Sequence, residues 1–168
     1  MRRSRWLLIV SALAVVGGGL YLLAARNDRP TGQFPELRPD LDAPAGYKWE
    51  FRDGPDFYTW VLAEPAEAGK RAKSGVGMYV GHHPNPSKTA GAEGRTAGRV
   101  CGRAVTWLVE RNDAAADPWV RRDVVLEYEH GPGYMPVSLH VWVWGPSEEV
   151  VAGLAAQLAG LTFSTRTR

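Results

Sequence analysis

Two adjacent histidines, His82 and His83, open a polar segment, residues 82–99, that is rich in glycine and proline. Histidine is a common metal ligand, but neighbours in a strand point to opposite faces, so both could hold one ion only after a turn. Pro84 and Pro86 could supply that turn. A metal site at His82 and His83 therefore competes with a second interpretation, solvated loop histidines, because no H-x-x-x-H or C-x-x-C spacing accompanies the pair.

Cys101 is the only cysteine in the 168 residues, so no disulfide within the chain can support the fold. A catalytic thiolate would need a nearby base, for which His83 and His130 are the candidates. Their spacing matches no Cys–His enzyme signature, and a lone cysteine is more often buried than reactive. Cys101, His83 and His130 are therefore the candidate catalytic residues, with simple burial of the thiol as the alternative.

A third candidate site lies in residues 137–144, where aliphatic side chains alternate with polar and aromatic ones. His140, Trp142 and Trp144 fall on one face of such a strand, and the other face is aliphatic: Val137, Leu139, Val141 and Val143. Large exposed aromatic side chains often mark a binding surface. We expect His140, Trp142 and Trp144 to form one, unless a second layer of the protein covers the rings.

Three carboxylates, Asp123, Glu127 and Glu129, project from one face of another predicted strand, residues 119–129. Paired carboxylates can act as general acid and base. Because no carboxylate from elsewhere can be placed opposite them, we interpret this row as the solvated face of an antiparallel strand.

The elements that must position these side chains follow from the hydropathy pattern. Alternating apolar and polar residues predict five strands, at residues 57–62, 76–80, 103–110, 119–129 and 137–144. Apolar residues at helical spacing then predict one late amphipathic helix, with a stripe of Val150, Val151, Leu154, Ala155 and Leu158. The predicted fold class is α+β: an antiparallel sheet of about five strands with one C-terminal amphipathic helix packed on it, preceded by an N-terminal transmembrane helix.

The predicted transmembrane helix is the uncharged run of residues 6–25, which at helical rise spans about 30 Å, the thickness of a bilayer core. Arg2, Arg3 and Arg5 precede it, and the positive-inside rule places them in the cytoplasm. A cleaved signal peptide is the alternative, although its apolar region is usually shorter. Both interpretations put the rest of the chain outside the cytoplasm.

The chain is expected to divide into a membrane anchor at 1–25, a proline-rich stalk at 26–46, an extracytoplasmic domain at 47–163 and a tail at 164–168. Residues 1–30 carry a net charge of +4. The formal net charge of the whole chain is +2, so the other 138 residues sum to −2. A domain so close to neutral has no basic stripe for nucleic acid. We expect no nucleic-acid partner, no cofactor and no second domain.

The run of residues 77–83, followed by Val100-Cys101-Gly102 and Trp107, resembles the exosortase-associated family of envelope proteins. That resemblance implies a role in polysaccharide export or protein sorting. The order of strands followed by a helix is similar to the photosystem-subunit-P-like fold. Neither resemblance carries a functional residue over to this chain.

These patterns favour a membrane-tethered, extracytoplasmic binding or assembly module of the bacterial envelope. Its expected partners are the membrane, through residues 6–25, and an envelope protein or a glycan. The alternative is an envelope enzyme, either a hydrolase or a sorting or export enzyme, that uses Cys101 or a histidine site.

The orientation of the anchor gives the first testable prediction. A phosphatase that is active only outside the cytoplasm, fused after Phe163, should be active in cells, because Arg2, Arg3 and Arg5 hold the N-terminus inside. A fusion that is inactive there, while a cytoplasmic reporter at the same position is active, would reverse the orientation.

Overall fold

The structure is a computed structural model that describes residues 36–86, 94–114, 116–129 and 136–166. All of these belong to one compact unit, Phe34–Arg168. Among the described residues no helix is both long and apolar enough to cross a bilayer, and the predicted anchor at 1–25 lies outside them.

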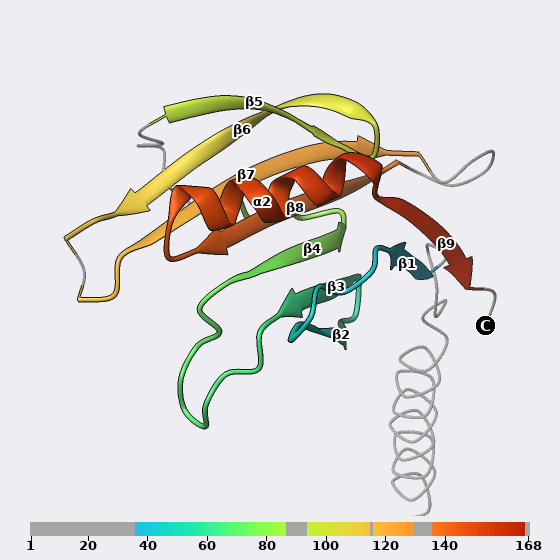
Figure 1. The fold of residues 1–168 in the computed structure, drawn as a ribbon. Coiled ribbons are helices and arrows are strands. Elements are labelled where there is room, and N and C mark those ends of the chain that lie inside the picture. The colour runs from blue at the N-terminus through green and yellow to red at the C-terminus, as the bar shows by residue number, and fades with distance from the viewer. Residues whose placement is uncertain (1–35, 87–93, 115, 130–135, 167–168) are drawn as a thin grey trace, which may run out of the picture. The chain divides into compact units, whose positions relative to one another are not determined.

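The described residues form nine strands in two antiparallel sheets and one short helix near the C-terminus (Figure 1). The strands are β1 (Glu36–Asp40), β2 (Lys48–Asp53), β3 (Phe57–Ala63), β4 (Gly75–Gly81), β5 (Gly94–Val100), β6 (Arg103–Asn112), β7 (Trp119–Tyr128), β8 (Val137–Gly145) and β9 (Thr162–Arg166). Helix α2 (Glu148–Gln157) continues into the 3₁₀ turn η1 (Leu158–Gly160). The predicted α+β class is therefore wrong, and the fold is mostly β.

The larger sheet has seven strands in the order β2-β3-β4-β8-β7-β6-β5, and β1 and β9 pair separately. Strand β8 lies between β4 and β7, so the C-terminal part of the chain completes the centre of the sheet. The five predicted strands correspond to β3, β4, β6, β7 and β8. The connection from β4 to β5 has to pass the three strands between them.

The four strands that the sequence analysis missed, β1, β2, β5 and β9, are all edge strands. Strand β5, with the sequence GRTAGRV, shows why: its only large apolar residue is Val100, and glycine and arginine fill most other positions. Edge strands bury little and are often kept short or charged, which weakens the apolar alternation. Hydropathy therefore detects the central strands and overlooks the edges.

One face of the seven-stranded sheet, which we call the covered face, carries the core. Helix α2 lies across β8 and β7 in Figure 1 and also contacts β4 and β5, so the sheet curves around it. The helix buries Val151, Leu154 and Ala155 there, and Leu158 of η1 follows them. They pack with aliphatic residues of the central strands: Val76, Met78, Val80, Val124, Leu139, Val141 and Val143. Burying each such side chain contributes about 1.5–3 kcal/mol.

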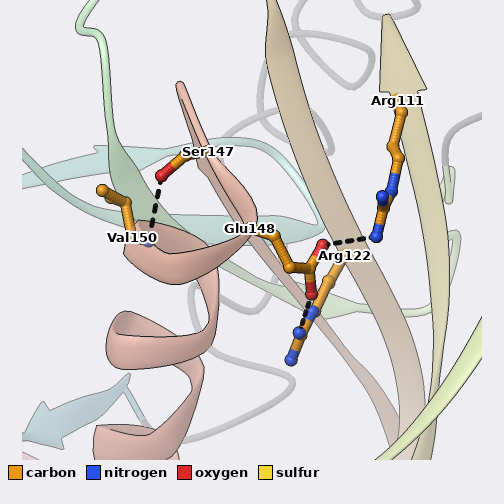
Figure 2. Close-up of polar contacts among 5 residues, drawn as sticks. All are labelled: Arg111, Arg122, Ser147, Glu148 and Val150. Atoms are coloured by element: carbon orange, nitrogen blue, oxygen red, sulfur yellow. Dashed lines mark hydrogen bonds and ion pairs between the residues drawn. The ribbon is translucent and has the colours of Figure 1, made fainter. Parts of the chain in front are cut away.

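The N-terminus of helix α2 is tied to the sheet by charges (Figure 2). The carboxylate of Glu148 lies 2.8 Å from Arg111 of β6 and also hydrogen-bonds to Arg122 of β7. The Ser147 hydroxyl accepts a hydrogen bond from the Val150 amide at 3.4 Å, which caps the first turn. Because Arg122 is mostly buried, its bond to Glu148 holds the helix more strongly than the exposed pair with Arg111 does.

The β1–β9 ribbon is fixed to the covered face beside the helix. The Leu37 amide donates to the Tyr58 hydroxyl at 2.8 Å, and the Trp60 indole donates to the Leu37 carbonyl at 2.9 Å. Leu37 itself is only 2% exposed. Residues 36–40, which the sequence analysis placed in the stalk, thus contribute a strand and a core side chain.

We call the opposite face the open face. It carries side chains such as Leu108, Asp123 and Trp142, which are neighbours in register on β6, β7 and β8. No described helix or strand packs on it. In its centre, glycines of β4 lie beside tryptophans of β8. A Cβ atom at Gly77 would lie 2.0 Å from the Trp142 ring, and one at Gly75 would lie 2.5 Å from Trp144.

Replacing Gly77 with alanine tests this packing. The added methyl group has no room against the Trp142 ring, so Gly77→Ala should lower the free energy of unfolding by about 1–3 kcal/mol. The matched control is Gly153→Ala on the exposed side of helix α2, where nothing lies within 4 Å and alanine should stabilise by about 0.5–1 kcal/mol. Chemical denaturation measures both. A neutral Gly77→Ala would mean that Trp142 does not lie on Gly77.

Candidate functional site

The open face carries apolar side chains that reach solvent. Leu108 of β6 is 38% exposed and Val125 of β7 is 40% exposed. Leu108 is paired with Asp123, and Val125 with His140, so all four side chains share this face. Apolar residues on the outer face of a sheet usually need a ligand or another surface to cover them when they are grouped.

A buried carboxylate lies beside these residues. Asp123 is 3% exposed, and the Arg121 guanidinium holds it through two hydrogen bonds of 2.7 Å, one to each oxygen. The His140 ring, also 3% exposed, adds a bond of 2.8 Å from Nε2 to Oδ1. The carboxylate therefore has three nitrogen partners, which together replace its lost hydration.

These partners keep Asp123 ionised. Burial by itself disfavours the charged form of the carboxyl, but the hydrogen bonds from His140 and Arg121 outweigh it and hold the pKa of Asp123 below its usual value. The negative charge of Asp123 and the positive charge of Arg121 then cancel within the cluster. The open face thus contains a compensated ion pair instead of a free acid.

The predicted binding residues His140, Trp142 and Trp144 all lie on the open face, in β8. His140 is buried against Asp123, and its ring centroid lies 5.0 Å from that of Trp142. The Arg121 guanidinium sits 5.7 Å from the Trp142 ring centroid. Trp144 is partly buried and donates to the Ala72 carbonyl at 3.1 Å, so its ring also ties β8 to the connection between β3 and β4.

A pocket of about 320 Å³ opens next to this cluster, over β7 and β6. Its walls include Leu108, Thr106 and Val125, and the carboxylate of Asp123 lies at its floor. Arg95 of the edge strand β5 stands at one side, paired across the ladder with Leu108. Its volume is at the lower end of the range for small-ligand sites.

The connection that leaves β4 forms another side of the pocket through Pro86. Pro86 lines the pocket, so this part of the connection reaches the open face. The last part of the long polar segment predicted at residues 82–99 belongs to strand β5, which begins at Gly94. Residues 87–93 lie outside the described residues.

Cys101 occupies a different part of the fold. It and Gly102 form the two-residue turn between β5 and β6, with φ angles of 52° and 73°. Their amides donate to the carbonyls of Leu158 and Ala159 at 3.0 and 2.8 Å, which satisfies the end of the helix. Burial raises the pKa of the Cys101 thiol to about 11, although nearby Arg103 lowers it, so the group is a thiol at neutral pH.

Of the histidine candidates for a thiol or metal site, the structure describes His82 and His83. His83 is exposed, and its amide donates to the Tyr79 hydroxyl at 3.1 Å. His130 lies outside the described residues. The His140 ring is bonded to Asp123, and no group of three potential metal-ligating side chains occurs in the part of the chain that the structure describes.

Leu108, Val125 and the burial of Asp123 were not predicted from the sequence. A signal for the first two was present, because Trp107-Leu108-Val109 and Val124-Val125-Leu126 are continuous apolar runs inside alternating strands. A strand with apolar residues at both odd and even positions places apolar side chains on both faces of the sheet. The burial of Asp123 had no such signal, since it depends on the register that brings His140 alongside.

Comparison of the chain with known protein families, with characterised proteins and with solved structures gives no match.

The Asp123 cluster predicts a pH-dependent stability. The folded pKa is lowered, so the stabilisation is complete above the unfolded value of about 4 and is lost as the pH falls through the folded pKa. Asp123→Asn should therefore cost about 3 kcal/mol at neutral pH, and this difference from the wild type should shrink in acid.

Denaturation at a series of pH values measures this difference. Glu127→Gln, which removes an exposed carboxylate from the same face of β7, is the matched control and should change little at any pH. A cost of Asp123→Asn that stays constant into strong acid would contradict an ionised, paired Asp123.

Proposed function

We propose that this protein is a membrane-tethered, extracytoplasmic binding module whose pocket on the open face takes a small, largely apolar ligand. The observation that carries the proposal is the exposure of Leu108 and Val125 around a pocket of about 320 Å³, on a face of the seven-stranded sheet that no described helix or strand covers. A ligand would remove these side chains from water, which favours binding.

The lining of the pocket favours a small apolar ligand over a glycan. Pro86, Leu108 and Val125 are apolar, and Thr106 is the one uncharged hydrogen-bonding side chain among the described lining residues. A sugar presents several hydroxyl groups, and each one that lost water without gaining a partner would weaken binding. Gly77 and Gly75 pack against the rings of Trp142 and Trp144, so less of the ring surface is left for stacking on a sugar.

The alternative of an enzyme that uses Cys101 has less support. Its thiol is neutral and forms part of a turn bonded to the end of the helix, whereas His140 lies on the open face and is bonded to Asp123. A thiol enzyme needs a thiolate beside a base. The tether remains part of the proposal on the strength of the apolar run at residues 6–25.

A photoreactive probe on the full chain in its membrane tests the pocket. Decanol that carries a diazirine should form adducts within residues 106–108 and 123–125, as mapped by mass spectrometry. Leu108→Asp should lower this labelling about tenfold, because it puts a charge where an apolar wall contributes roughly 1.4 kcal/mol.

The control is Ala156→Asp, on the exposed side of helix α2, which should leave the labelling unchanged. Circular dichroism checks that each variant is folded. Adducts spread evenly over the domain, or labelling indifferent to Leu108→Asp, would overturn the proposed function.

A further inference from the structure

We propose that the ligand of this pocket is a single-chain amphiphile with one carboxylate, whose chain lies against Leu108 and Val125 and whose carboxylate pairs with Arg95. The inference rests on the proposed function and specifies its ligand class. It follows from the distribution of charge around the pocket, taken residue by residue.

Among the described residues that line the pocket, Arg95 is the cation without a compensating charge. It lines the pocket from the edge strand β5, its side chain is exposed, and it forms no ion pair or hydrogen bond with another described residue. Its register partner is Leu108, so the guanidinium and the apolar wall are neighbours on one face. A guanidinium presents a planar pair of donors that matches the two oxygens of a carboxylate.

The floor of the pocket does not oppose an anion. Asp123 is negative, but Arg121 cancels its charge, and its oxygens already accept three hydrogen bonds from Arg121 and His140. A cationic ligand would find this carboxylate already paired. The described lining residues and Arg121 together carry one net positive charge, which is the charge of Arg95. This positive charge favours an anionic ligand over a cationic one.

The described part of the chain offers one free cation at the pocket, which limits the charge of the ligand to about one. Arg99, the next basic residue on the same face of β5, donates to the Gly102 carbonyl at 3.3 Å and is not among the residues that line the pocket. One guanidinium pairs fully with one carboxylate, whereas a phosphate dianion would need a second cation. The apolar walls formed by Pro86, Leu108 and Val125 then suit an alkyl chain.

The test compares two diazirine probes on the full chain in its membrane, decanoic acid and its uncharged methyl ester, at a pH above neutrality. Arg95→Gln should lower labelling of the open face by the acid about fivefold, as expected for one partly exposed ion pair. Labelling by the ester should not change. Arg99→Gln, on the same strand and face but outside the pocket, is the matched control and should change neither.

The outcomes separate this inference from the proposed function. If the ester labels the open face and Arg95→Gln affects neither probe, the carboxylate preference is overturned and the apolar pocket stands. If Arg95→Gln lowers labelling by both probes equally, Arg95 supports the pocket wall but does not recognise the carboxylate of the ligand, and the inference also fails. If neither probe labels the open face, the proposed function is overturned with it. Competition by a leucine-ending peptide that exceeds competition by decanoate would replace the ligand class with a peptide carboxylate.

Discussion

The buried carboxylate of Asp123 must keep both of its partners, and the arrangement of the open face depends on this requirement. An ionised carboxylate without compensation would be too costly to bury, so Arg121 and His140 have to lie where the register of β7 and β8 places them. Arg121 then lies over Trp142, and Trp142 lies on Gly77. One charge pairing thus connects three central strands on the side that helix α2 does not cover.

The two faces of the sheet have separate tasks. The covered face supplies the stability, through the aliphatic side chains of β4, β7 and β8 under helix α2, the helix N-terminus bonded to Arg122, and the helix C-terminus closed by the Cys101–Gly102 turn. The open face then needs few apolar side chains for folding. Apolar residues that are nevertheless exposed there, beside a pocket and an arginine that pairs with no other described residue, are available for a ligand.

The sequence predicts the central strands and the helix because their burial is strong and periodic, as in Val137–Gly145, where every second residue is aliphatic. It does not predict the mostly-β class, since edge strands such as β5 bury too little to show a period. Alternation also assigned His140, Trp142 and Trp144 to one face, which depends on strand geometry alone. The partners of Asp123 could not be predicted, because they depend on the pairing of β7 with β8. The pocket is lined from β5, β6 and β7, and no local pattern specifies that these strands are neighbours.

The central claim is that the working site lies on the open face, between Leu108 and Val125 and beside Arg95. Crystals of the protein soaked with 10-bromodecanoate would test this claim most directly, because the anomalous signal of bromine locates the ligand without assumptions about its pose. We predict a bromine position over β6 and β7 on the open face, with the carboxylate within hydrogen-bonding distance of Arg95. A bromine position at the Cys101–Gly102 turn or on the covered face, with the open face empty, would contradict the account.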